Sequence, residues 1–308
     1  RARERRRKVR RVWRNPIAWR EARTRAAAGG RSLLRPVFVV AGVLAGAALF
    51  LGHYGGWWGL GAANPGATRF LLTVFVWLEL AVILLVVTNT AATTLTRERE
   101  AQTMELLLTT PLTSRYIAAG MLQGLVRLAL PLIAVPTGLI LAFAVAGLLA
   151  ASPPVAPLEA AIGAPLLMIG FAALAAMIGL QFSLVSRKTV KAVMTATAVV
   201  LGVAGLLSAC GAFLSDQDSL LAAALLPFAP FPAMQAVLDP WSVVGRQATW
   251  NTWGGGPGPA PSVADIRSFR TVAFTFSLVA AAVYLGVTYA LHKGMVRNFD
   301  MIVRRQAL

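Results

Sequence analysis

Long runs without charged residues alternate with short charged segments along this chain. Five stretches contain no Asp, Glu, Lys or Arg: Pro36–Thr68, Leu128–Leu158, Ala160–Ser186, Ala192–Ser215 and Thr271–His292. A sixth stretch, Phe70–Leu95, is interrupted only by Glu79. Each is longer than the roughly 20 residues that a helix needs to cross a bilayer. The pattern predicts an all-α, polytopic membrane protein whose six transmembrane helices occupy residues 36–292.

The distribution of charge predicts the orientation of the chain. The sequence is 57% apolar and only 13% charged, with a net charge of +17. Of its 29 Lys and Arg residues, 25 lie in segments 1–35, 96–127 and 187–191 or after His292, which six crossings place on one side. Basic residues concentrate on the cytoplasmic side of membrane proteins, so both termini are expected there. Their partners are expected to be anionic lipid headgroups or a cytoplasmic protein, and not nucleic acid.

Both ends of the chain are predicted to be basic and cytoplasmic. Within residues 1–35, Asn15 and Pro16 form a helix-start signal. In the predicted helix Trp19 lies on an apolar face, whereas Arg20 and Arg23 are turned largely away. This pattern is typical of an amphipathic helix lying on the membrane surface, and an ordinary solvated arm is the alternative. Residues 293–308 are expected to form a basic tail.

Glu79 is the one acidic residue predicted to lie inside the membrane. It follows the outer end of the second span by about ten residues, which places it about 15 Å deep. An acid at that depth costs about 2.5–3.5 kcal/mol on insertion scales and should face protein or water. Thr90 continues the same helical face toward the cytoplasm. A substrate-pathway role and a structural hydrogen bond to a neighbouring helix are equally supported.

The outer side carries one long segment, residues 215–270. Its first part is apolar but contains Pro227, Pro230 and Pro232, so we predict a broken or re-entrant helix pair followed by a loop anchored by tryptophans. His53 is expected at the outer interface. No metal site is expected, because the only other histidine, His292, is predicted at the opposite membrane face.

Segment 96–127 is charged, and its polar and apolar residues are arranged as on a helix. Its polar residues include Glu98, Arg99, Glu100 and Glu105, and its narrow apolar side includes Leu107 and Leu108 before Pro111 ends the helix. We predict a helical hairpin that projects into the cytoplasm, with one face on the membrane domain and the other available to a partner. A solvated surface helix also fits this periodicity.

This segment resembles one found in ABC-2 type transporter permeases, the membrane subunits of ABC exporters. The matching residues are Glu98, Arg99, Glu100, Thr103, Glu105, Leu106–Leu108 and Thr110–Leu112, as in the pattern E-R-E-x-x-T-x-E-L-L-L-x-T-P-L. The start NPIAWREARTR and the six-span plan are also similar to that family, whereas Gln102 stands where many members have glycine. The resemblance implies a permease of a bacterial inner membrane whose coupling hairpin docks on an ATPase subunit.

The sequence also predicts that this chain does not bind ATP. Each of the four lysines follows a residue other than glycine, so the sequence has no G-x-x-x-x-G-K-[ST] loop. ATP and Mg²⁺ are therefore expected in the partner ATPase, and no cofactor on this chain. The family plan implies a second permease unit, as a homodimer, a heterodimer or an upstream half of the same chain. A sequence that starts with Arg1 is expected to belong to a longer protein.

Two other functions stay open at this point. One is a gradient-driven secondary transporter that uses Glu79 as a proton or ion relay. The other is a non-transporting membrane scaffold with a partner-binding hairpin. An enzyme is disfavoured, because the sequence has no G-x-S-x-G or H-E-x-x-H motif, and no catalytic residue is predicted. The substrate is not predicted, although the apolar spans mildly favour an amphiphile.

Overall fold

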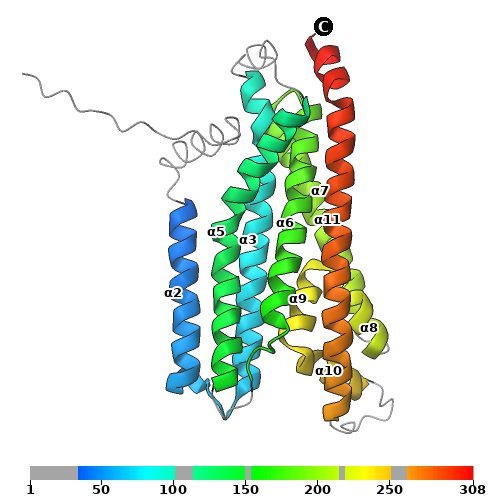
Figure 1. Cartoon of the computed structure of the whole chain (residues 1–308). Coiled ribbons are helices and arrows are strands. Elements are labelled where there is room, and N and C mark those ends of the chain that lie inside the picture. The colour runs from blue at the N-terminus through cyan, green and yellow to red at the C-terminus, as the bar shows by residue number, and fades with distance from the viewer. Residues whose placement is uncertain (1–33, 101–113, 150–153, 215–218, 251–261, 308) are drawn as a thin grey trace, which may run out of the picture.

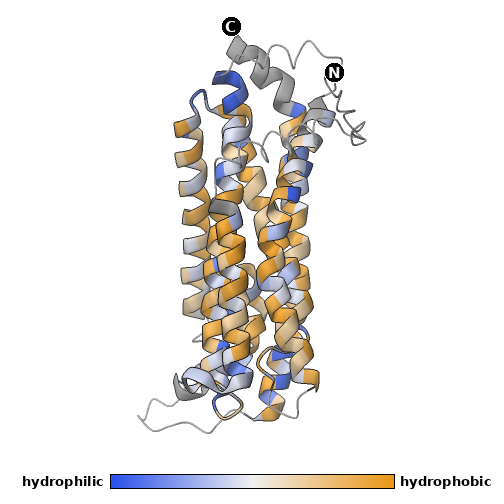
Figure 2. Ribbon diagram, turned by 90° about the vertical axis from the view of Figure 1, so that its left-hand side faces the viewer, coloured by the Kyte–Doolittle hydropathy of each residue, from blue (hydrophilic) through white to orange (hydrophobic). Residues whose placement is uncertain are grey.

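The protein is an elongated bundle of long helices (Figure 1). The computed structural model describes residues 34–100, 114–149, 154–214, 219–250 and 262–307. Six helices in these ranges are long and apolar enough to cross a membrane: α2 (Leu34–Gly55), α3 (Pro65–Glu100), α5 (Ser114–Leu149), α6 (Ala160–Val185), α7 (Thr189–Leu214) and α11 (Val263–Ala307). Hydrophobic residues cover most of the bundle's length, and hydrophilic residues gather near its ends (Figure 2). The prediction of an all-α polytopic membrane protein with six spans is confirmed.

The bundle has two distinct ends (Figure 1). At the C-terminal end, α3, α6 and α11 finish and α5 and α7 begin. At the far end, α2 finishes and α3, α6 and α11 begin. The two arms of the predicted hairpin are therefore continuous with membrane spans, because α3 runs to Glu100 and α5 starts at Ser114.

Helix α6 forms the centre of the packing. It lies between α3 and α11 and also contacts α5 and α7, whereas α2 packs mainly on α5. Small residues let its neighbours approach closely. A Cβ placed on Gly170 would lie 3.2 Å from the Cβ of Tyr284 in α11. A Cβ placed on Gly179 would likewise meet Ala91 of α3. The large buried side chains around this centre include Leu80, Phe143 and Leu132.

Short helices at the far end replace a plain loop between α7 and α11. They are α8 (Ser219–Leu225), the 3-10 turn η2 (Leu226–Phe228), α9 (Pro230–Leu238) and α10 (Pro240–Trp250). The chain breaks around its prolines, in agreement with the predicted broken helix. Pro230 and Pro232 lie in the first turn of α9, where a backbone N–H would have no partner within the helix. The carbonyl of Phe228, in the turn before α9, accepts a hydrogen bond from the hydroxyl of Tyr284 in α11.

The structure differs from the sequence-based boundaries at both ends of the last span. Helix α11 begins at Val263, so residues 263–270 of the predicted outer loop are helical, and it continues past His292 to Ala307, so the predicted tail extends the last span. His53 lies in the last turn of α2 at the far end, and its side chain is only 3% exposed. Its Nδ1 lies 2.9 Å from the hydroxyl of Thr68, because a buried imidazole between α2 and α3 needs a polar partner.

Candidate functional site

The last turn of α3 joins the corner between α6 and α7 through two charged side chains. Arg99 donates from Nη2 to the carbonyl oxygen of Leu184 at 2.7 Å and from Nη1 to that of Ser186 at 3.1 Å. The last carbonyls of a helix have no partner within it and carry partial negative charge. The half-buried guanidinium of Arg99 therefore caps the C-terminal end of α6.

Glu100 makes the complementary contact with α7. Its carboxylate accepts a hydrogen bond of 2.8 Å from the backbone N–H of Thr189, the first residue of α7. The first N–H groups of a helix lack internal partners, and a negative charge is favoured there. Two neighbouring residues of opposite charge thus bind the end of one helix and the start of the next. Glu98 lies half-buried in the same turn.

One turn deeper, a serine of α6 bonds directly to the backbone of α3. The hydroxyl oxygen of Ser183 accepts from the N–H groups of Leu95 at 2.9 Å and Thr96 at 3.2 Å. The threonine hydroxyls of this region return to carbonyls of their own helix: Thr90 donates to Val86, Thr94 to Thr90 and Thr96 to Ala92. The two bonds to Ser183 attach the last two turns of α3 to α6.

The two helix backbones meet just beyond this point. A Cβ on Gly179 would lie 2.6 Å from the Cβ of Ala91 and 2.8 Å from the carbonyl oxygen of Thr88, closer than non-bonded atoms approach. The end of α3, the end of α6 and the start of α7 therefore form one stiff unit. Sequence reasoning missed Gly179 and Ser183, although their small-x-x-x-small spacing was a detectable signal.

The structure places only part of the predicted hairpin. Glu98, Arg99 and Glu100 are brought together at the α6–α7 corner, and Arg99 and Glu100 bond within the chain. The other predicted hairpin residues lie outside the described residues: Thr103, Glu105, Leu107, Leu108 and Pro111. The predicted interfacial helix with Trp19, Arg20 and Arg23 also lies outside them.

Glu79 occupies a closed position among three helices. It is 1% exposed, and its Oε1 lies directly beside Gly42 of α2. If Gly42 carried a Cβ, that atom would lie 2.4 Å from Oε1 of Glu79 and 3.0 Å from Val135 of α5. Its Oε2 has no hydrogen-bond partner among the described residues. Thr90 lies eleven residues farther along α3, about 16 Å away by helical rise. The structure does not join the two predicted pathway residues.

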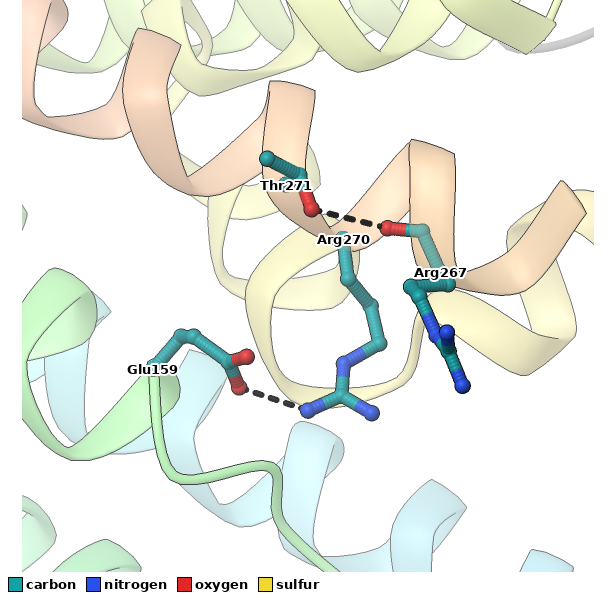
Figure 3. A network of polar contacts seen from close by, with 4 residues as sticks. All are labelled: Glu159, Arg267, Arg270 and Thr271. Atoms are coloured by element: carbon teal, nitrogen blue, oxygen red, sulfur yellow. Dashed lines mark hydrogen bonds and ion pairs between the residues drawn. The ribbon is translucent and has the colours of Figure 1, made fainter. Parts of the chain in front are cut away.

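A polar cluster at the far end was not singled out by sequence reasoning. Arg270 of α11 and Glu159, at the start of α6, point toward one another, with Nη2 and Oε2 2.7 Å apart (Figure 3). Burial raises the pKa of the Glu159 carboxyl, but hydrogen bonding, chiefly from Arg270, outweighs it and holds that pKa below its ordinary value. This ion pair ties α11 to α6.

Arg69 of α3 lies in the same cluster. It donates from Nη2 to the carbonyl of Pro154 at 2.8 Å, and its guanidinium carbon lies 3.7 Å from the ring centroid of Trp241 in α10. Arg267, one turn before Arg270, is exposed and accepts at its carbonyl a hydrogen bond from the Thr271 hydroxyl (Figure 3).

Comparisons of this chain with models of protein families and with curated proteins found no match. The interpretation of its function therefore rests on the geometry described above and on the resemblance carried by residues 98–112.

Proposed function

We propose that this chain is the membrane permease subunit of an ABC-2 type exporter in a bacterial inner membrane. In this proposal the energy comes from ATP hydrolysed, with Mg²⁺, in a separate ATPase subunit. The observation that carries it is the attachment of the last turn of α3 to the α6–α7 corner by Arg99 and Glu100. A segment that receives force from a partner must be firmly connected to the membrane helices. The hydrogen bonds of Arg99 and Glu100 supply such a connection.

The proposed lever has a continuous route through the membrane. Helices α3 and α5 each contain 36 residues, or about 54 Å at 1.5 Å per residue. A displacement of the hairpin at residues 96–127 would move both helices directly. Helix α6 and the start of α7 would follow α3 through Ser183, Arg99 and Glu100. Pro131 and Pro136 lie within α5, and a proline inside a helix provides a point where the helix can bend.

The charges of the described residues support a cytoplasmic C-terminal end. Basic residues there include Arg97, Arg127, Arg187, Lys188, Lys191 and Lys293, and the far end has Arg69, Arg246, Arg267 and Arg270. By the positive-inside rule both chain termini lie in the cytoplasm, where the ATPase docks. The functional assembly in this proposal contains a second permease unit, and membrane lipids surround it.

Charge reversal in the hairpin tests the proposal. Glu105→Lys alters the proposed docking segment and leaves Arg99 and Glu100 themselves unchanged, so we expect loss of the ATPase from the affinity-purified complex and loss of ATP-driven transport. Arg267→Glu, a charge reversal at an exposed residue of the far end, is the control and should retain both. The unfolding temperature of each purified variant checks folding. A Glu105→Lys variant that keeps ATPase and transport would refute the docking role.

A second candidate function rests on Glu79. A buried carboxylate with a partnerless Oε2, seated beside a glycine, has the features of a proton-binding group in a gradient-driven transporter. This candidate predicts transport into or out of vesicles under a proton gradient without ATP, abolished by Glu79→Gln. A strict requirement for ATP would eliminate it.

A further inference from the structure

A pocket of about 500 Å³ opens at the far end between the start of α3 and the α9–α10 corner. Its buried lining includes Arg69, Thr73 and Asp239, which are 8%, 5% and 7% exposed. A ligand held there would meet charged groups removed from bulk water, where electrostatic attraction is strong.

The pocket contains one cation and one anion. Arg69 is fixed by its bond to Pro154 and by the Trp241 ring, and its Nε has no hydrogen-bond partner among the described residues. Asp239 lines the same pocket, and its Oδ1 accepts from the N–H of Ser242 at 3.3 Å. Asp239 also interacts electrostatically with Arg69, so the pocket presents a pair of opposite charges. Such a pair suits a ligand that itself carries both signs.

Two tryptophan side chains also line the pocket. Trp77 donates its indole N–H to the carbonyl of Phe231 at 2.7 Å, which fixes the ring in the pocket wall. Trp241 contributes a second ring. Tryptophan rings attract ammonium groups, so the wall reinforces the preference of Asp239 for a cationic group.

The mouth of the pocket is apolar and continues along α3. Phe70 and Val74 line it and are 64% and 40% exposed, and Leu78, one turn farther, is 62% exposed. Residues four apart lie on one helical face, so these three form an apolar track leading from the pocket along the membrane span. A polar pocket joined to an apolar track matches a phospholipid, which has a headgroup and acyl chains.

We propose that this pocket binds the headgroup of phosphatidylethanolamine from the membrane leaflet at the far end. The phosphate binds Arg69, because arginine and phosphate form strong charge-assisted hydrogen bonds. The ammonium group lies against Asp239 and Trp77. A choline headgroup has no N–H to donate to the carboxylate, and a glycerol headgroup has no positive charge to offer it. This inference needs neither an ATPase nor transport, so it stands apart from the proposed function.

Native mass spectrometry of the delipidated full chain tests lipid binding. The protein is titrated separately with phosphatidylethanolamine, phosphatidylcholine and phosphatidylglycerol that carry the same acyl chains. We expect one tight phosphatidylethanolamine per chain, bound about tenfold more strongly than either other lipid, the effect of one charge-assisted hydrogen bond. Equal affinity for all three lipids, or no tight binding, would overturn the proposal.

Two pairs of variants locate the site. Val74→Trp fills the mouth without removing any bond, and Leu71→Trp adds the same bulk at a 42% exposed position of α3 outside the pocket. Arg69→Gln removes the pocket cation, and Arg267→Gln removes an exposed one at the same end. We expect Val74→Trp and Arg69→Gln to weaken phosphatidylethanolamine binding about tenfold, and their controls to bind normally. Because Val74→Trp removes no charge and no side-chain hydrogen bond at a partly exposed position, it tests the site even if Arg69→Gln unfolds.

A soluble headgroup distinguishes a lipid site from a phosphate-ester site. Glycerophosphoethanolamine carries the same charges without acyl chains, so it should fail to displace the lipid at matched concentration. Displacement at matched concentration would assign the pocket to a soluble ligand and overturn the lipid assignment. Normal lipid binding by both pocket variants would equally overturn the proposal.

Discussion

Gly179 of α6 and Ala91 of α3 are in direct contact, since a Cβ on Gly179 would lie 2.6 Å from that of Ala91. The contact brings the two backbones together, and one turn later Ser183 reaches the amides of Leu95 and Thr96. Arg99 then caps the end of α6. The crossing thus begins a series of contacts that runs to the end of the bundle.

The smallest possible side chain at this crossing should disrupt it. We expect Gly179→Ala to lower the free energy of unfolding by about 1–3 kcal/mol, the usual cost of overpacking. Chemical or thermal denaturation in detergent measures the effect. Gly202→Ala on α7, where a Cβ meets no atom within 4 Å, is the matched control and should raise stability by up to about 1 kcal/mol, because alanine favours a helix over glycine. Equal stability of the two variants would show that the crossing is not tightly packed.

Arg99→Lys tests whether the positive charge at the end of α6 is sufficient without the two hydrogen bonds that Arg99 donates. Lysine keeps the positive charge but cannot reproduce the planar fork that reaches Leu184 and Ser186. We expect a loss of about 1–3 kcal/mol of stability from one missing charged hydrogen bond. In the proposed exporter, transport per ATP hydrolysed should also fall while the ATPase still co-purifies.

The neighbouring Arg97 provides the control for that experiment. It is exposed in the same turn of α3, so Arg97→Lys should leave stability and coupling unchanged. Full coupling in a folded Arg99→Lys protein would contradict the role of this side chain in the lever.

Glu79 and Gly42 should be energetically coupled. Gly42→Ala places a methyl group 2.4 Å from Oε1 of Glu79, and we expect it to cost about 1–3 kcal/mol in the native background. In a Glu79→Ala background the space is open, and the same substitution should cost much less. A double-mutant cycle measures the difference. Gly138→Ala, which meets no atom within 4 Å, should behave additively with Glu79→Ala.

The Glu159–Arg270 ion pair predicts a pH-dependent stability. The pKa of Glu159 is below its ordinary 4.5 in the folded protein, so the pair stabilises the fold above pH 4.5, and the stabilisation disappears as the pH falls through the folded value. Glu159→Gln should thus be less stable than the native chain at neutral pH, and the gap should close in acid. Because the Glu159 side chain is 41% exposed, we expect at most about 1 kcal/mol. A gap that stays constant into acid would contradict the ion pair.

The pattern of charge-free runs determined the number and class of the spans. An uncharged run longer than about 20 residues buries its side chains in lipid and its backbone bonds within a helix, so the run alone specifies a span. The break between Pro227 and Pro232 was also readable, because three prolines within six residues remove several backbone donors from one short stretch. These are local properties, and each held in the structure.

Only the tertiary structure decided which residues meet. Arg99 and Glu100 were recognisable as polar, but their partners at Leu184 and Thr189 lie more than 80 positions away. His53 is buried beside Thr68 in the fold, and the pocket of Arg69 forms because the α9–α10 corner, with Asp239 and Trp241, lies against the start of α3. Composition and periodicity describe one helix at a time, whereas these contacts depend on how separate helices cross.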